Sequence, residues 1–104
     1  MITYEIVEVD AHRAQELSAA GWFVLDVRSD EEWAAGHIPG STHMPMNEVV
    51  AGLGSRVPEP TVVVTADGTK GWRVAQYLKN QGLESAYLVG GIFAWELAGL
   101  PLER

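Results

Sequence analysis

The architecture is set by the stretch Thr61-Val-Val-Val-Thr-Ala-Asp-Gly-Thr-Lys-Gly-Trp-Arg73. Its three consecutive valines are apolar on both faces of a strand, so we expect a buried central strand. A polar loop of small residues follows, and after Gly71 the apolar residues take the spacing of a helix. A buried strand, a loop and a helix start form a pocket at the carboxyl end of the strand, where open α/β sheets usually bind ligands. We therefore expect the functional site at this loop.

Length and composition indicate one globular domain. The chain has 104 residues, of which 47% are hydrophobic and 20% are charged, as is typical of a single domain. It holds no run of about 18 apolar residues, so we expect no membrane span. The N-terminus lacks the basic start and apolar core of a signal peptide, so we expect a cytoplasmic location.

Two features of the composition exclude classes of function. The chain has no cysteine, which removes disulfides, thiolate catalysis and thiolate metal sites. The formal net charge is −7. A nucleic-acid partner is therefore not expected, because proteins bind the phosphate backbone through Lys and Arg.

Strand and helix patterns alternate along the chain. We expect strands at residues 2–7, 22–25, 41–44, 62–64 and 86–89. We expect helices at residues 30–35, 70–81 and 92–98, and two more that Asp10 and Asn47 cap and that end at residues 20 and 53. Ser29 and Glu32 form a capping box at the start of the helix at 30–35. This alternation predicts an α/β fold, a parallel sheet with helices on both faces.

Three separated stretches resemble one family. They are Phe23-Val-Leu-Asp-Val-Arg28, Glu32-Trp-Ala-Ala-Gly-His-Ile-Pro-Gly-Ser41, and Tyr87-Leu-Val-Gly-Gly-Ile-Phe-Ala-Trp95 followed by Gly-Leu-Pro101. In this order they resemble the signatures of rhodanese domains over almost the whole chain. The resemblance implies a single rhodanese-like domain, residues 1–104, with a five-stranded, mostly parallel sheet and helices on both faces.

The resemblance also implies a function for the loop. Active members of the family carry a cysteine as the first loop residue, which holds a sulfane sulfur as a persulfide, and their loop typically reads Cys-Arg-x-Gly-x-Arg, then Ser or Thr. Here Gly68 matches and Lys70 keeps a positive charge, and the loop length fits the sulfurtransferase branch rather than the phosphatase branch. Thr65 stands in place of the cysteine, and Ala66 in place of the first arginine.

Thiolate chemistry decides how much this replacement matters. A persulfide needs a soft thiolate, whose pKa is lowered by nearby amides and positive charge. A threonine hydroxyl is poorly ionised at neutral pH, and as a nucleophile it needs an adjacent base such as its own N-terminal amine. Thr65 is internal, with no histidine near it in sequence. We therefore expect no sulfur transfer by the family mechanism.

The loop can still bind an anion, depending on Asp67. Backbone N–H groups that point inward at a helix start form an anion-binding nest. A carboxylate of Asp67 that faced this nest would repel anions, whereas turned outward it would leave Lys70, Arg73 and Arg28 to form a weak anion site. Asp67 and Gly68 also suit a plain turn, which we favour. In a further alternative Asp67 folds back onto the loop amides and occupies the pocket itself.

The candidate site has a loop and a rim. The predicted binding loop consists of Thr65, Ala66, Asp67, Gly68, Thr69, Lys70 and Gly71, and the predicted pocket rim of Asp26, Arg28, Trp72 and Arg73. We expect Asp26 and Arg28 to pair with each other. Trp72 would wall the pocket or anchor a partner if exposed, but we favour burial, as we do for Trp33 and Trp95.

No metal or cofactor is expected. His37 and His43, with Met44 and Met46, suggest a copper or zinc site at first sight. His37 lies in the Gly-His-Ile turn of the family signature, where a structural role fits better, and no third strong ligand is near.

These observations favour a rhodanese-like domain without the catalytic cysteine, a binding or regulatory module rather than an enzyme. The expected partner is a small anion (sulfate, thiosulfate or phosphate) or an unidentified protein, with no nucleic acid and no membrane. Two alternatives stay open. One is a sulfurtransferase-type enzyme, whose natural loop carries Cys or which works through Thr65. The other is a small-anion-binding protein that uses Thr65, Gly68, Thr69 and Lys70.

Overall fold

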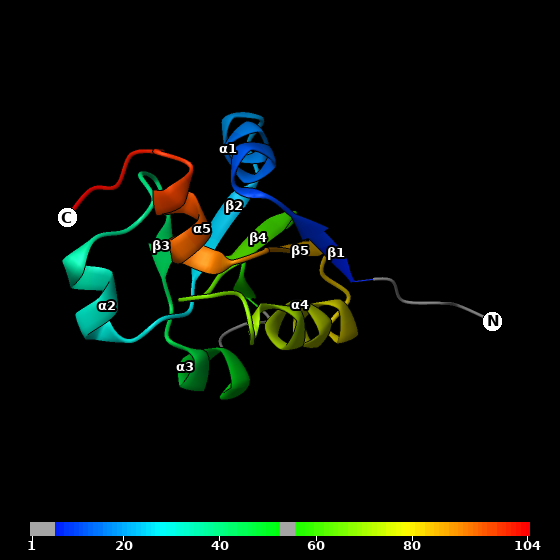
Figure 1. The fold of residues 1–104 in the computed structure, drawn as a ribbon. Helices are drawn as coiled ribbons and strands as arrows, with labels where there is room; N and C mark the ends of the chain where they lie inside the picture. The colour runs from blue at the N-terminus through cyan, green and yellow to red at the C-terminus, as the bar shows by residue number, and fades with distance from the viewer. Residues whose placement is uncertain (1–5, 53–55) are drawn as a thin grey trace.

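The computed structural model describes residues 6–52 and 56–104, which contain one five-stranded sheet. The strands are β1 (Val7–Val9), β2 (Phe23–Asp26), β3 (Thr42–His43), β4 (Thr61–Val64) and β5 (Ser85–Leu88). Their spatial order is β1-β5-β4-β2-β3, and all four strand pairs are parallel (Figure 1). The α/β fold class with a central β4 is therefore confirmed, and the sheet is parallel throughout.

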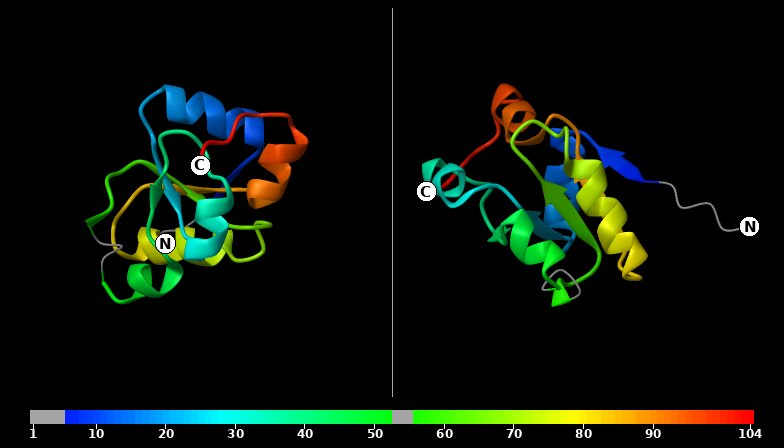
Figure 2. Two further views of the ribbon diagram at one scale, coloured as in Figure 1. Left: turned by 90° about the vertical axis from the view of Figure 1, so that its left-hand side faces the viewer. Right: turned by 90° about the horizontal axis from the view of Figure 1, so that it is seen from below.

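Helices cover both faces of the sheet, as expected. They are α1 (Ala11–Ala19), α2 (Asp30–Ala35), α3 (Met46–Val50), α4 (Gly71–Asn80) and α5 (Gly91–Leu97). Figure 2 shows α1 and α5 on one face and α3 and α4 on the other. Each face has its own core: Val62 and Val64 pack with the first pair of helices, and Val63 packs with the second. Successive side chains of β4 point to opposite faces of the sheet, and helices cover both faces, so β4 is apolar on both sides.

Local capping follows the sequence in two helices and departs from it in a third. Asp10 accepts a hydrogen bond from the N–H of Arg13 at 2.8 Å, and the capping box at Ser29 is complete. The predicted cap Asn47 is wrong, because the N-cap of α3 is Pro45, two residues earlier, and Asn47 lies inside the helix. The carbonyl of Pro45 accepts from the N–H groups of Glu48 and Val49, so the turn closes without a side-chain cap. The expected end at residue 53 lies outside the described residues.

The first strand also differs from its prediction at residues 2–7. β1 spans Val7–Val9, and residues 2–5 lie outside the described residues. The pairing partner sets this position: Val7 lies opposite Ala86 of β5, and the N–H of Val89 donates to the carbonyl of Val9. Among the described residues, no helix is both long enough and apolar enough to cross a membrane.

The C-terminal segment lies against the turn that follows α2. His37 and Glu103 exchange two backbone hydrogen bonds at 2.8 Å, an isolated antiparallel bridge outside the sheet. The indole Nε1 of Trp95, which is buried as expected, donates to the carbonyl of Pro101 at 2.8 Å. These contacts hold the C-terminal segment beside α5 and against the turn that follows α2 (Figure 1).

Candidate functional site

A cavity of about 380 Å³ opens at the carboxyl ends of β2 and β4. It is lined by Val27, Arg28, Ser29, Glu32, Met46, Thr65, Ala66, Asp67, Thr69 and Lys70. One wall is the segment from β2 into α2, and the other is the loop from β4 to α4. The parallel sheet brings these walls together, because neighbouring parallel strands end at the same edge.

Thr65 organises the loop. It follows β4 directly and is 6% exposed, and its Oγ1 accepts a hydrogen bond from the N–H of Gly68 at 2.8 Å. Behind the loop, the first N–H groups of α5 hold it in place: Ile92 donates to the carbonyl of Thr65 at 2.9 Å, and Phe93 to that of Ala66 at 3.1 Å. The hydroxyl therefore occupies one inward amide of the loop, at the position where the family signature has its nucleophile.

Two glycines allow this close packing. Gly68 has φ +87, and a Cβ there would lie 2.5 Å from the backbone nitrogen of Gly90. Gly91 has φ +56, and a Cβ there would overlap the carbonyl oxygen of Thr65. Any larger residue would push the loop away from α5, so the pocket depends on both positions.

Asp67 folds back onto the loop. Its Oδ1 accepts from the N–H of Thr69 at 3.0 Å and from the hydroxyl of Thr69 at 2.8 Å. These two donors, the N–H first, hold the pKa of the Asp67 carboxyl below its ordinary value of 3.8. The side chain is exposed and lines the cavity as an anion at neutral pH. With Gly68 and Thr69 both donating within the loop, two of its amides are already satisfied.

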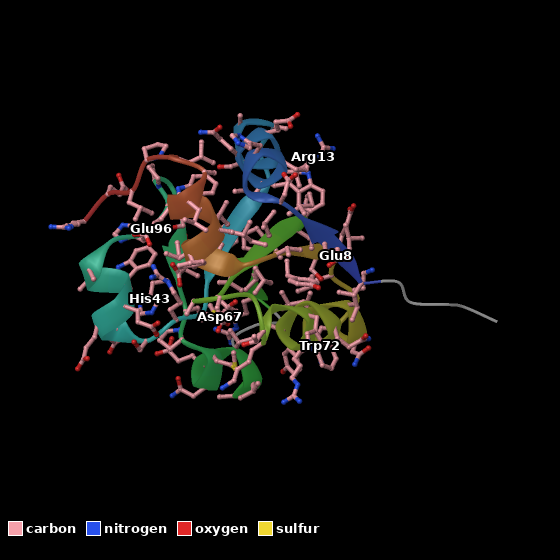
Figure 3. All side chains as sticks on the ribbon, viewed as in Figure 1. Glu8, Arg13, His43, Asp67, Trp72 and Glu96 are labelled. Carbon is pink, nitrogen blue, oxygen red and sulfur yellow. The ribbon has the colours of Figure 1, made fainter. Side chains whose placement is uncertain are left out.

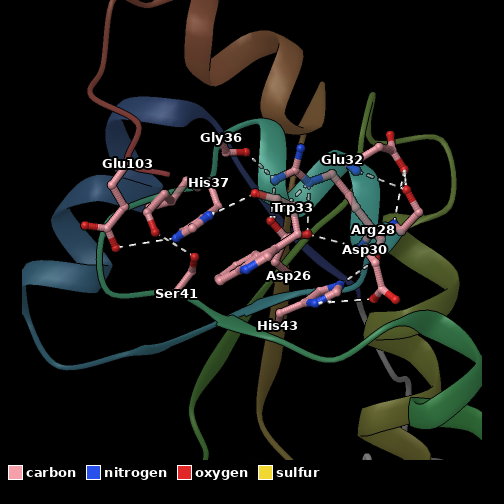
Figure 4. A network of polar contacts seen from close by, with 12 residues as sticks. Asp26, Arg28, Asp30, Glu32, Trp33, Gly36, His37, Ser41, His43 and Glu103 are labelled. Atoms are coloured by element: carbon pink, nitrogen blue, oxygen red, sulfur yellow. Dashed lines mark hydrogen bonds and ion pairs between the residues drawn. The ribbon is translucent and has the colours of Figure 1, made fainter.

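Asp26 and Arg28 form a buried ion pair, as predicted. Asp26 is completely buried, and its two carboxylate oxygens accept from Arg28 Nε and Nη2 at 2.8–3.0 Å. Nη2 also donates to the carbonyl of Gly36 at 2.7 Å (Figure 4). Arg28 lines the cavity, whereas Asp26 lies behind it. Within the described part of the chain, Nη1 of Arg28 has no hydrogen-bond partner.

The remaining predicted site residues fall into two groups. Lys70 lines the cavity with an exposed side chain, but Gly68, Gly71, Trp72 and Arg73 do not line it. The predicted burial of Trp72 is wrong, because its side chain is 44% exposed. Figure 3 shows Trp72 on the side of α4 away from the sheet, with the guanidinium of Arg73 at 5.4 Å from its ring centroid. The sheet side of α4 is taken by Gly71, Val74, Ala75 and Leu78.

The structure adds pocket residues that sequence reasoning missed. Ser29 and Glu32, singled out only as a capping box, also line the cavity, as do Val27 and Met46. The capping box could have indicated this from the sequence, since it places the carboxylate of Glu32 at the start of the helix that follows β2, next to the expected pocket. The pocket thus has four charged lining residues from two segments, rather than a loop alone.

Trp33 is half-buried and stacks on two histidines rather than on the core. Its ring centroid lies 3.5 Å from that of His37 and 5.0 Å from that of His43, with the rings nearly parallel (Figure 4). Because carbonyls only accept, Nδ1 of His37 donates to the carbonyl of Trp33 and Nε2 of His43 to that of Arg28. The described residues hold no group of three or more His, Cys, Asp or Glu side chains that could bind a metal ion.

Known proteins match this chain along nearly its whole length. Residues 10–98 match the family described as "Rhodanese-like domain". Two relatives are named "Thiosulfate sulfurtransferase GlpE": that of Pseudomonas putida (strain GB-1) is 34% identical over 95% of this chain and 92% of its own. That of Pseudomonas fluorescens (strain Pf0-1) is 36% identical with the same coverage.

Solved structures agree with this assignment. A rhodanese-related protein from Thermoplasma volcanium superimposes with a TM-score of 0.84 at 25% identity, over 93% of this chain and 97% of that one. A rhodanese-like domain protein from Staphylococcus aureus gives 0.79 at 26% identity, over 95% and 100%. The arrangement of strands and helices is thus the one that these proteins share.

Proposed function

The chain belongs to the rhodanese-like domain family, and from this premise we propose that it is a binding or regulatory module of the family that does not transfer sulfur. One observation carries the proposal. Thr65 stands at the end of β4, where the family signature places its cysteine, and the sequence has no cysteine at any other position. Without a thiol, no residue of this chain can hold a persulfide.

The surroundings of Thr65 support the same conclusion. In the described part of the chain, the hydrogen bond at its side chain is the one it accepts from Gly68, and no imidazole or carboxylate lies within bonding distance of Oγ1. A threonine nucleophile needs such a base. The hydroxyl serves the loop as an acceptor and is not activated.

Binding remains a sensible role because the pocket is kept open. The side chains of Thr65 and Asp67 accept hydrogen bonds from two amides of the loop, but they do not fill the pocket. A cavity of about 380 Å³ remains in front of the loop. Ligand pockets usually fall in the range of roughly 300–1,000 Å³. Small anions and an unidentified protein remain the proposed partners, and the cytoplasm the proposed location.

The test is a thiosulfate-to-cyanide transfer assay. We expect no turnover from this protein under conditions in which the Pseudomonas putida relative, as positive control, is active. Thr65→Cys should give at most weak turnover, because Ala66 and Asp67 also depart from the family loop. Clear turnover by the unmodified protein, with a mass gain of one sulfur atom, would overturn the proposal.

The small-anion alternative needs loop amides that are free to bind the anion. The amides of Gly68 and Thr69, which it would use, already donate to Thr65 and Asp67. A sulfate ion would have to displace these side chains or rely on the cations of the lining, Arg28 and Lys70. Titration with sulfate, followed by the NMR signals of the loop amides, decides this: a saturable shift supports the anion site, and flat signals contradict it.

A further inference from the structure

The charges that line the cavity are balanced, which is unusual for a pocket expected to bind oxyanions. Arg28 and Lys70 are the two cations of the lining, and Glu32 and Asp67 are its two carboxylates. Asp26 adds one more negative charge next to the cavity, because its buried carboxylate pairs with Arg28 at 2.8 Å. A doubly charged anion therefore gains nothing from the sum of these charges. Instead, each carboxylate repels it at short range, since unlike charges attract and like charges repel most strongly where solvent is partly excluded.

The charges are also distributed evenly between the two walls. Arg28 and Glu32 belong to the segment from β2 into α2, and Asp67 and Lys70 to the loop from β4 to α4. Each wall therefore presents one cation and one carboxylate. A ligand between the walls meets both signs from either side, and it also meets the apolar side chains of the lining, Val27, Met46 and Ala66.

Three of the four groups are held in place by hydrogen bonds that, among the described residues, leave one charged atom without a partner. Glu32 uses Oε1 for the N–H and hydroxyl of Ser29, which leaves Oε2. Asp67 uses Oδ1 for Thr69, which leaves Oδ2. Arg28 is fixed by Asp26 and Gly36, which leaves Nη1. Groups that are positioned before a ligand arrives lose little entropy on binding, which favours specific recognition.

We infer that this cavity binds a small zwitterion, a molecule with one ammonium group and one carboxylate or sulfonate group, in preference to a doubly charged oxyanion. The ammonium group is placed between Glu32 and Asp67, and the acid group reaches Arg28 and Lys70. The apolar residues of the lining accommodate a short methylene chain. This inference rests on the proposed binding function and names its ligand class.

The binding test compares small probes that differ in charge. Taurine and γ-aminobutyrate are the zwitterions, butyrate and butylammonium carry one charge each, and sulfate and thiosulfate are the oxyanions. At constant ionic strength, the NMR signals of the loop amides at residues 66–70 are followed in each titration. We expect saturable shifts with a zwitterion and binding of singly charged probes that is about two- to fivefold weaker, the range of one partly exposed ion pair. Tighter binding of sulfate or thiosulfate, or no saturable shift with either zwitterion, would overturn the inference.

Charge-neutral variants test which side chains are responsible. Glu32→Gln keeps the capping box, since Gln also bonds the N-cap N–H, and Asp67→Asn keeps the acceptor for Thr69. The double variant should lose zwitterion affinity about tenfold and gain affinity for sulfate, because two repelling carboxylates are removed. Glu31→Gln is the matched control: Glu31 is an exposed neighbour in the same helix turn and does not line the cavity.

The control should bind as the unmodified protein does. An equal loss in Glu31→Gln, or unchanged zwitterion binding in the double variant, would contradict the assignment. The outcome is separable from that of the proposed function. A protein that transfers sulfur to cyanide refutes the non-catalytic role whatever it binds, and a catalytically silent protein that ignores zwitterions refutes this inference alone.

Discussion

Replacing Arg28 with methionine is expected to lower the free energy of unfolding by about 3–5 kcal/mol, the usual cost of removing one partner from a buried ion pair. Asp26 has no exposed surface, and the side chain of Arg28 is 6% exposed. Methionine keeps the apolar stem but removes the donors at 2.8–3.0 Å from the carboxylate. Among described residues, Asp26 is then left with one donor, the N–H of residue 28 at 3.0 Å. The carbonyl of Gly36 loses its Nη2 partner as well.

A loss of this size is a large share of the total stability, which is about 5–15 kcal/mol for a domain. Urea denaturation followed by circular dichroism measures it, and heating should show a Tm lower by about 12 °C or more. Arg13→Met is the matched control, because Arg13 pairs with Glu16 at 3.5 Å with both side chains more than half exposed. It should cost about 0.5 kcal/mol or less. Equal, small losses in both variants would show that the pair of Asp26 and Arg28 is not desolvated, and would refute the reasoning.

Two further predictions concern the loop. Gly91→Ala should cost about 2 kcal/mol or more, because its Cβ would overlap the carbonyl of Thr65. Gly82→Ala should cost only about 1 kcal/mol, since Gly82 has a similar positive φ but no atom within 4 Å of the new Cβ; equal losses in urea denaturation would argue against close packing of the loop. The second prediction is a pH dependence. The pKa of Asp67 is lowered by its bonds from Thr69, so the folded state binds this proton less tightly than the unfolded state. The resulting stabilisation is present above the ordinary value of 3.8 and is lost as the pH falls below it. Asp67→Asn should therefore become relatively more stable on acidification in paired denaturation curves; a difference that is constant between about pH 6 and pH 2 would contradict this.

Local hydrogen bonding was predictable because its partners are close in sequence. The cap at Asp10 and the capping box of Ser29 and Glu32 join residues three apart, so a short window contains the whole interaction. The buried strand β4 was predictable for a similar reason, since three consecutive valines favour a strand and leave it no polar face. The cap of α3 was missed because Pro45 closes the turn through its carbonyl, which no side-chain pattern reveals.

Properties that depend on distant partners could not be predicted. The position of β1 follows from its register with β5, and the exposure of Trp72 follows from which face of α4 meets the sheet. The pairing of His37 with Glu103 joins residues that have β3, β4 and β5 between them in the sequence. Sequence patterns describe periodicity, and periodicity does not state which neighbour an element will meet.

The absence of a thiol that could hold a persulfide is readable from composition, because none of the 104 side chains is a cysteine. The charge of the pocket is not readable in this way. Glu32 and Asp67 are far apart in the chain, and both line the cavity because parallel β2 and β4 end at the same edge of the sheet. The preference of a pocket for a charged ligand depends on distances in space, so only the folded structure decides which class of ligand fits. The absence of the cysteine nucleophile depends only on which residues the sequence contains.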